Sequence, residues 1–469
     1  MVSIPFPKTS APGSGGRMIN CRHDLLPASS RSVDVWRRAP GLRAFATTAR
    51  SGHRGSILVG STLYTAFANN ITRFDSVGAA TSVGTLSGTD GVFWARNNKL
   101  PTPDIVVVDP GNGAFVVTSS SVSSYPDADL PAANSVTFMD GYFFFTTGDG
   151  RCFASDLNST AINASTYISA EGRPDGLLRA IAFSDLYLAG TGSIEVWHNT
   201  AETAPAFPFR RLGVIPKGII GRYAISGFED GIGKGIVFVG DDKIVYALNG
   251  YTPTPISSPD VEAAIAAFIE AGGDPNSIKM FPYVVAQRPS IVLRTTSWTW
   301  VLDMTSLEWH ERESHLAPTW RATGSVFAFN KWLCGDIGSG NLMEISEFAR
   351  DEIGGPLLMT LESGQVATFP SRAAVAEAVF DVRQGVGVAT GADPMQTDPT
   401  IAISHTDDGR TWSTPRYRKL GRQAVTAGPV KLVKCGSTKT QGRRWRLQVS
   451  DAVDVEVYGG DMSAEPRRA

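Results

Sequence analysis

Apolar and polar residues alternate with a period of two in short runs along most of this chain. Each run ends in Gly, Asp or Asn and is followed by another such run. The alternation predicts β-strands, and the turn residues predict that neighbouring strands form hairpins. Seven units of this kind begin at Leu58, Val106, Phe143, Leu186, Ile236, Val292 and Phe327.

The spacing of these hairpins indicates a repeat. Their starts lie 35 to 56 residues apart, about 45 on average, and a four-stranded propeller blade takes roughly 40–50 residues. We therefore expect an all-β protein with a β-propeller of six or seven blades over residues 55–355. Stacking the blades around an axis would bury faces that no blade can bury alone. Two β-sandwiches in tandem are the alternative.

The two flanks of the predicted propeller have different patterns. Residues 1–54 are rich in Pro, Gly, Ser and Arg, and we expect them to form an extended basic arm that lies on another surface. Residues 356–469 predict a C-terminal β module. Its candidate strands are Val375–Val382, Thr400–His405, Val430–Cys435, Trp445–Val449 and Val453–Tyr458.

One helix is expected inside the propeller region. Ser258 can cap it, Pro259 suits its first position, and an apolar stripe including Val261 and Ile265 follows before Gly272 ends it. We expect this helix to pack on the outside of a blade.

Composition narrows the fold class further. The 469 residues include 48 Gly and 28 Pro, a share above the average of about 12%, which argues against helical bundles and α/β barrels. Four widely separated cysteines form no CxxC pair, which excludes a zinc cluster or a disulfide framework and suggests reduced thiols in a cytosol. No apolar run approaches about 18 residues, so no membrane anchor is expected.

The net charge of −2 hides a strong asymmetry. Residues 1–54 carry a net charge of +7 and residues 410–446 one of +11, whereas residues 55–409 carry −17. The basic ends can dock on acidic surfaces of the same or a neighbouring copy, contact nucleic acid, or serve solubility alone. The sequence pI of about 6.3 argues against a dedicated DNA-binding protein.

The motifs that resemble parts of known enzymes do not match the patterns that catalysis requires. His310 and His315 resemble the zinc motif HExxH, but the second histidine comes one position late and would face away on a helix. Asp407, Gly409 and Trp412 resemble the Asp-box turn of sialidases, in which Asp407 would accept backbone N–H groups. That turn is structural, and glycoside hydrolysis needs a pair of carboxylates that the sequence does not single out. No catalytic residue, metal site or cofactor is therefore predicted.

A series of short motifs between residues 171 and 221 resembles a known family. The order of these motifs is similar to that in the packaged-DNA stabilisation proteins of short-tailed bacteriophages, also called tail nozzle or tail hub proteins. The residues that carry the resemblance are Arg173, Pro174, Asp175, Gly176, Gly190, Glu195, Trp197, Pro208, Phe209, Lys217 and Gly218.

The resemblance implies a structural role and no enzyme activity. Such proteins form a ring, usually of six copies, below the portal and the head-to-tail adaptor. They extend the DNA channel, help to retain packaged DNA, and support tail spikes or fibres and a needle or plug. DNA would pass through the lumen without sequence-specific binding. The protein would belong to the virion tail and be assembled in the cytoplasm of the bacterial host.

For the adaptor or subunit contact we expect a basic strip near the C-terminus. Its members are Arg416, Arg418, Lys419, Arg422, Arg443, Arg444 and Arg446. A solvated charged face is the simpler explanation of the same residues. Two other functions stay open, namely a sialidase-like propeller that binds or cleaves glycans and a cellular scaffold propeller.

Overall fold

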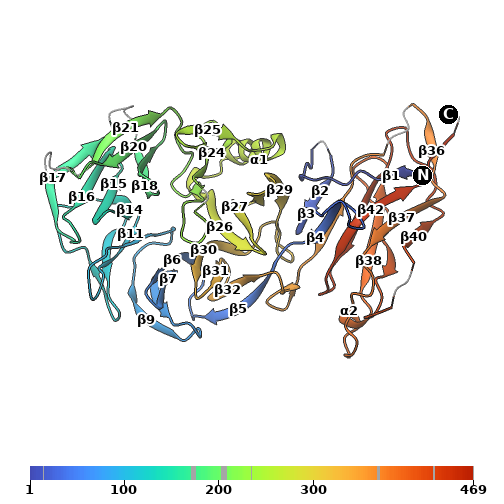
Figure 1. Ribbon diagram of the computed structural model, residues 1–469, viewed down its shortest axis with the longest axis horizontal. Helices are drawn as coiled ribbons and strands as arrows, with labels where there is room; N and C mark the ends of the chain where they lie inside the picture. Colours follow the sequence, from blue (N-terminus) through green and yellow to red (C-terminus); the bar gives the residue numbers. More distant parts are fainter. Residues whose placement is uncertain are drawn as a thin grey trace. The chain divides into compact units, whose positions relative to one another are not determined.

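Short antiparallel strands make up most of the computed structural model, which describes residues 1–13, 15–170, 176–201, 207, 209–233, 235–366, 370–425 and 428–467 (Figure 1). The chain forms two compact units. The propeller unit comprises Ala44–Ser297 and Arg321–Ile345. The sandwich unit comprises Met1–Arg43, Trp298–Trp320 and Ser346–Ala469.

Four-stranded sheets follow one another along the propeller unit, each an antiparallel meander. The first is β6 (His53–Val59), β7 (Thr62–Phe67), β8 (Asn70–Phe74) and β9 (Ala80–Thr85). The second is β10 (Phe93–Arg96), β11 (Ile105–Asp109), β12 (Gly113–Val117) and β13 (Val122–Ser124). The third is β14 (Ala133–Met139), β15 (Tyr142–Thr147), β16 (Arg151–Ser155) and β17 (Ile162–Ser169).

The meanders continue to the end of the unit. The fourth sheet is β18 (Leu177–Ala182), β19 (Leu186–Gly190), β20 (Ile194–Asn199) and β21 (Phe209–Ile215). The fifth is β22 (Ile225–Ser226), β23 (Val237–Val239), β24 (Val245–Asn249) and β25 (Thr252–Pro255). Next, β26 (Lys279–Val285) pairs with β27 (Arg288–Arg294). Finally, β30 (Ala322–Ala328), β31 (Lys331–Asp336) and β32 (Asn341–Ser346) pair in order.

The first strands of these sheets form a closed ring, as Figure 1 shows. β6 lies beside β10, β10 beside β14, and β14 beside β18, while β22 lies beside β26, β26 beside β30, and β30 beside β6. Arg179 of β18 donates a hydrogen bond to the carbonyl oxygen of Ile225 in β22, at 3.2 Å. The unit is therefore a β-propeller, as the sequence predicts.

The two ends of the propeller segment meet at the last sheet. Phe45, near the start of the unit, stacks on Phe329 with ring centroids 5.9 Å apart. The amide of Thr48 donates to the carbonyl oxygen of Gly340 at 2.8 Å. Joining the first and last segments of the propeller unit in one sheet closes the ring and removes free sheet edges.

The hairpins expected from the sequence correspond to strand pairs of this ring. The pairs β6–β7, β11–β12, β15–β16, β19–β20, β23–β24 and β31–β32 lie where the alternating runs predicted hairpins, which confirms those predictions. The run from Val292 contains β27 and β28 (Thr299–Asp303).

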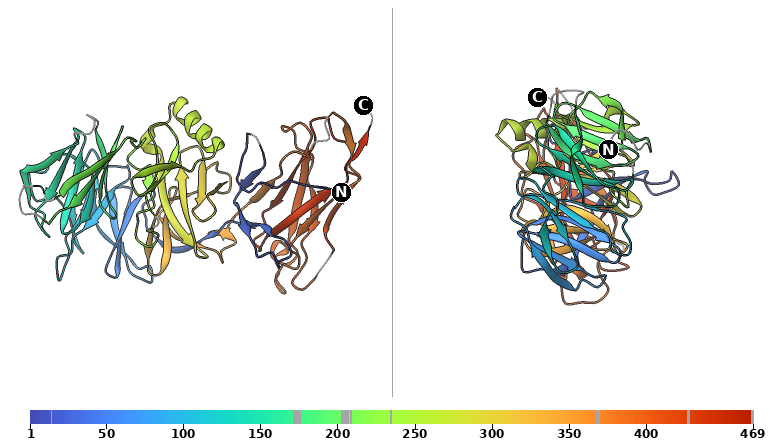
Figure 2. Two further views of the ribbon diagram at one scale, coloured as in Figure 1. Left: turned by 45° about the horizontal axis from the view of Figure 1, so that its top comes forward. Right: turned by 90° about the vertical axis from the view of Figure 1, so that its left-hand side faces the viewer.

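The predicted helix is present as α1 (Pro259–Glu270), followed by the 3₁₀ turn η1 (Pro275–Ser277). The Ser258 side chain accepts a hydrogen bond from the amide of Val261 and caps the helix, and Val261, Ile265 and Phe268 are buried. The helix lies at the periphery of the propeller unit, beside β24 and β25 (Figures 1 and 2). No helix within the described ranges is long and apolar enough to cross a membrane.

The sandwich unit contains two sheets around a common core. One sheet has the order β3 (Cys21–Leu25), β4 (Asp34–Arg38), β42 (Glu456–Met462), β37 (Glu377–Val382) and β40 (Val430–Val433), with β1 (Val2–Ser3) on β42. The other contains β28, β29 (Glu308–Glu311), β2 (Arg17–Ile19), β35 (Met359–Glu362), β41 (Arg444–Val449), β38 (Thr400–Thr406) and β39 (Arg416–Lys419).

Smaller elements complete this unit. They are β33 (Asp351–Glu352), β34 (Gly355–Pro356), β36 (Arg372–Ala374), the short helix α2 (Pro394–Thr397) and β43 (Glu465–Arg467). β5 (Gly41–Thr47) begins in this unit and continues into the propeller unit, where it lies next to β32. The core between the two sheets includes Met18, Trp36, Leu361, Phe380 and Trp445, so it draws on both ends of the chain.

Residues 1–43 are built into the sandwich unit. β2 pairs in parallel with β29 and antiparallel with β35, and β4 pairs with β42 (Figure 2). The sequence predicted an extended arm over 1–54, a propeller over 55–355 and a module over 356–469. The compact units follow other boundaries, because N-terminal strands pair with strands of the C-terminal segment, and β29 of residues 298–320 pairs with the N-terminal β2.

Candidate functional site

The predicted basic strip separates into two groups of residues. Arg443, Arg444 and Arg446 lie at or in β41, inside a sheet, whereas Arg416, Arg418 and Lys419 lie in β39, the end strand of that sheet. Arg422 follows in the next loop. These two settings give the side chains different roles.

The three arginines at β41 form ion pairs with acidic side chains of the sandwich unit. Arg443 is buried and forms two hydrogen bonds to the Asp407 carboxylate, at 2.7 and 2.9 Å. Arg444 and Arg446 both pair with Glu362 of β35, at 3.5 and 2.7 Å. These contacts hold the sheet together, so this half of the strip does not offer free charge to a partner.

The β39 group remains at the surface. Arg418 and Arg416 donate hydrogen bonds to the carbonyl oxygens of Lys431 and Val433 in β40, at 2.9 and 2.8 Å, and so link the end strands of the two sheets. Lys419 pairs with Asp398 but is 74% exposed, and Tyr417 is 64% exposed. We call Arg416, Tyr417, Arg418, Lys419 and Arg422 the β39 patch.

The Asp-box turn exists, with one change from the expected assignment. The carboxylate of Asp408, not that of Asp407, accepts the backbone N–H groups of Arg410 and Thr411, at 2.9 and 2.8 Å. These bonds lower the pKa of Asp408. Asp407 instead lies beside the buried Arg443 guanidinium, which requires an acidic partner.

The other two turn residues have structural roles. Gly409 has a φ of +72°, which favours glycine. Trp412 is half-buried, and the Arg446 guanidinium lies 3.6 Å from the centroid of its ring.

The family motif residues that the structure describes stabilise the fourth and fifth sheets. Glu195 of β20 is buried and accepts hydrogen bonds from the Trp197 indole, at 3.0 Å, and from Arg211, at 3.3 Å. Phe209 is buried at the start of β21, Gly176 precedes β18, and Gly190 ends β19. The four residues that lie outside the described ranges are Arg173, Pro174, Asp175 and Pro208.

The Lys217-Gly218 pair packs between neighbouring sheets. Lys217 forms an ion pair with Asp242, which raises the pKa of Lys217. A Cβ atom on Gly218 would lie 2.2 Å from the backbone of Thr191. Only glycine allows this close approach of two loops.

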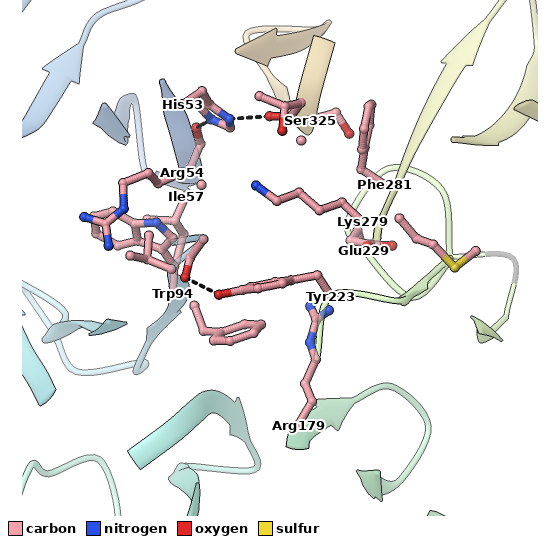
Figure 3. Close-up of a pocket in the computed structure, with 18 of the residues that line it drawn as sticks. His53, Arg54, Ile57, Trp94, Arg179, Tyr223, Glu229, Lys279, Phe281 and Ser325 are labelled. Carbon is pink, nitrogen blue, oxygen red and sulfur yellow. Dashed lines mark hydrogen bonds between the residues drawn. The ribbon is translucent and has the colours of Figure 1, made fainter. Parts of the chain in front are cut away.

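A cavity of about 270 Å³ lies at the centre of the propeller unit (Figure 3). Residues of the first strands, or directly beside them, line it in every sheet of the ring, among them Ile57, Trp94, Tyr223 and Phe281. Tyr223 stacks on Phe93 with ring centroids 5.2 Å apart, and its hydroxyl donates to the carbonyl oxygen of Gly91 at 2.6 Å. The stacking and the hydrogen bond hold this aromatic part of the wall in position.

Most charged groups on the cavity wall are cationic. Arg54 forms a buried ion pair with Asp109 at 2.7 Å. Arg179 lies between the rings of Phe93 and Phe228, 4.9 and 5.1 Å from their centroids, and burial lowers its pKa to about 10.

Burial also shifts the pKa values of the other titratable groups on the wall. Burial, with Arg294 nearby, lowers the pKa of Lys279 to about 8. Burial raises the pKa of Glu229, and it lowers the pKa of His53 to about 4, so His53 is neutral at pH 7.

This arrangement favours anion binding over hydrolysis. Glu229 is the one carboxylate among the side chains that line the cavity, whereas glycoside hydrolysis uses two. Within the described ranges, no group of His, Cys, Asp and Glu side chains has the arrangement of a metal site. Sequence reasoning missed the cavity because Arg54, Arg179, Glu229 and Lys279 are far apart in the chain. The only local sign of the cavity in the sequence is Lys279, a charged residue at the start of the otherwise apolar strand β26.

Comparisons with known proteins agree with the propeller. A family model described as "Bacteriophage P22 Gp10, beta-propeller" matches residues 27–348. No curated protein matches the sequence.

Similar folds occur among solved structures. The WD40 β-propeller domain of Doa1 is 10% identical over 65% of this chain and 96% of that chain, with a TM-score of 0.40. PorZ of the type-IX secretion system of Porphyromonas gingivalis is 11% identical over 72% of this chain and 44% of that chain, with a TM-score of 0.39.

Proposed function

Because this chain belongs to a family of bacteriophage packaged-DNA stabilisation proteins with a β-propeller fold, we propose that it is the nozzle protein of a short-tailed phage. In this proposal, copies of the chain, six in number, form a ring below the portal and the head-to-tail adaptor. The ring extends the DNA channel, helps to retain the genome, and carries spikes or fibres and a plug or needle. The protein acts structurally and catalyses no reaction.

The observation that supports an assembly role most directly is the β39 patch. It presents basic side chains on the end strand of a sheet, and Lys419 and Tyr417 are largely exposed. Complementary charge across an interface sets the register of the partners and speeds their encounter. An acidic surface of the adaptor or of a neighbouring copy fits this patch.

The ion pairs of the other basic residues reduce the number of residues that can contact a partner. Arg17 pairs with Glu311, Arg37 with Glu456, and Arg443 with Asp407, all within the sandwich unit. The basic ends of the chain thus neutralise acids of the same chain in large part. The contact with a partner is therefore assigned to the β39 patch, which includes the exposed Lys419 and Arg422, rather than to Arg443, Arg444 and Arg446.

The central cavity does not favour the alternative of a glycan-cleaving propeller. Its wall supplies one carboxylate, Glu229, where hydrolysis requires a general acid and a second carboxylate at a defined separation.

The test is a charge reversal in the β39 patch, Lys419→Glu with Arg422→Glu. Lys419 and Arg422 are exposed, and the Lys419–Asp398 pair that the variant breaks lies at the surface. The variant should therefore unfold close to the wild-type temperature but be absent from phage particles viewed by electron microscopy. Arg444→Glu is not suitable, because it would place a second acid beside Glu362 and destabilise the sheet.

The control reverses two exposed cations of the propeller unit, Arg96→Glu with Lys99→Glu, and should assemble normally. Normal tails from the β39 variant would refute the assignment of the patch. Wild-type particles should show six copies of the chain around the channel, and any other symmetry would exclude the hexamer.

A further inference from the structure

Three cationic side chains, Arg54, Arg179 and Lys279, line the central cavity of the propeller, against one carboxylate, Glu229. Lys279 extends into the cavity from the start of β26, and Figure 3 shows its side chain reaching toward the middle of the space, between Tyr223 and Ser325. Among the residues that the structure describes, no carboxylate lies within ion-pair distance of its ammonium group. The Tyr223 ring lies 5.8 Å away and interacts with this charge only weakly.

A second donor on the same wall also lacks a partner. The indole N–H of Trp94 is buried and has no hydrogen-bond acceptor in the structure. A buried donor without an acceptor costs about 1–3 kcal/mol. Native proteins leave few such groups unsatisfied, and a bound water or ion is one explanation for those that remain.

Fixed positive charge adds to these two donors. Arg179 is held between two aromatic rings and bonds to backbone carbonyl oxygens, including that of Ile225 at 3.2 Å. The Asp109 carboxylate neutralises Arg54. The burial that raises the pKa of Glu229 also favours the uncharged form of this acid.

The size of the cavity suits a small molecule. A bound water needs roughly 10–15 Å³ of such space, whereas the cavity offers about 270 Å³. Its wall combines aromatic and aliphatic side chains with polar groups that face one space, as small-ligand sites do.

We propose that the centre of the propeller binds a small-molecule oxyanion, a phosphate or a carboxylate compound, with Lys279 and the Trp94 indole donating hydrogen bonds to its oxygens. Arg179 contributes charge from the wall. This site is separate from the β39 patch and does not depend on the assembly proposed above.

The experiment measures binding to the full chain in solution. Inorganic phosphate, pyrophosphate and citrate are titrated separately by isothermal calorimetry and by thermal unfolding, with sodium chloride at matched ionic strength as the reference. At least one of these anions should bind with one site per chain and raise the unfolding temperature above that in chloride. Binding of phosphate and pyrophosphate without citrate would indicate a phosphate ligand, and the reverse would indicate a carboxylate.

The decisive variant is Lys279→Met, which keeps the length of the side chain and removes its charge. It should weaken anion binding at least tenfold, and in anion-free buffer it should unfold no lower than wild type, because it removes an unpaired ammonium group from the cavity. The control Lys243→Met lies outside the cavity beside Glu270 and should bind like wild type.

Two results would overturn the proposal. One is a wild-type chain that responds to all three anions no more than to chloride. The other is a Lys279→Met variant that binds the anion as tightly as the Lys243→Met control. Trp94→Phe gives an independent check, since it removes the indole N–H while keeping an aromatic ring at this position, and it should also weaken binding.

Discussion

His23 shows how two neighbouring acids can decide the charge of one buried side chain. Its ring lies in the sandwich unit, with Nε2 2.8 Å from an Asp34 oxygen and Nδ1 3.0 Å from a Glu308 oxygen. Burial alone would lower the pKa of His23, but the hydrogen bonds to Glu308 and Asp34 outweigh it and raise the pKa. The imidazolium therefore joins β3, β4 and β29.

This contact predicts that His23 stabilises the sandwich unit in a pH-dependent way. A group whose pKa is raised by folding stabilises the folded state fully below its ordinary value, about 6.5, and loses that contribution as the pH rises through the raised value. The unfolding temperature of wild type should therefore exceed that of His23→Gln most at pH 5.5–6.5. The difference should shrink steadily up to pH 9, and a difference independent of pH would contradict the charged bridge.

A glycine in the propeller predicts a purely steric effect. Gly218→Ala would place a Cβ atom 2.2 Å from the Thr191 backbone, which cannot move without shifting a loop. We expect a loss of about 1–3 kcal/mol in the free energy of unfolding, measured by urea denaturation. The control is Gly213→Ala in β21, where a Cβ would meet nothing within 4 Å, and this change should be close to neutral.

At the scale of elements, the Asp407–Arg443 pair ties the turn after β38 to β41. Removing one member of a buried ion pair leaves the other charged and unpaired, which typically costs 3–5 kcal/mol. Asp407→Ala should therefore lower the free energy of unfolding by about 3 kcal/mol, because Arg443 keeps its bonds to the carbonyl oxygens of Cys435 and Ser437.

Two further variants test whether this buried ion pair contributes more to stability than an exposed ion pair does. Asp407→Ala combined with Arg443→Met should cost less than the sum of the two single changes, because the unpaired charge is gone. Asp398→Ala, which breaks the exposed pair with Lys419, should cost less than about 1 kcal/mol. Equal losses for Asp407→Ala and Asp398→Ala would refute the structural role of the buried pair.

The sequence predicted strands that contain an apolar run or a clear alternation of apolar and polar residues, and it missed strands that are mostly exposed. Most of the predicted hairpins are the two middle strands of a sheet, such as β11–β12, whose first strand is buried throughout. Outer strands such as β17 are mostly exposed and polar, so they lack an apolar alternation. The sequence predicts an arm in place of β2 because the pairing partners of β2 lie about 300 residues or more away in the sequence.

The basic strip and the central cavity also differ in how far the sequence could predict them. The basic strip could be found because its charges cluster in the sequence, but the sequence could not show that Arg443, Arg444 and Arg446 pair inside the sheet. Lys279 and Trp94 come together only when the ring of sheets closes, so no local pattern points to them.

At the scale of the whole molecule, the chain leaves the sandwich unit and returns to it twice. Residues 1–43, 298–320 and 346–469 make one unit, and the propeller segments lie between them in the sequence. The core of the sandwich unit contains Met18 and Trp36 from the first segment and Leu361 and Trp445 from the last. The N-terminal segment is therefore part of a folded unit rather than a tether for partners.

This topology predicts that the first segment is required for the fold of the last one. A chain without residues 1–25 loses β2, which pairs with both β29 and β35, and β3, which pairs with β4. It also exposes the core around Met18. Limited proteolysis read by mass spectrometry should cut this variant throughout residues 346–469 but spare residues 44–297, because the propeller closes its ring within its own unit. A free basic arm would predict the opposite result, an unchanged cleavage pattern in both units, since removing it would take no strand from either sheet.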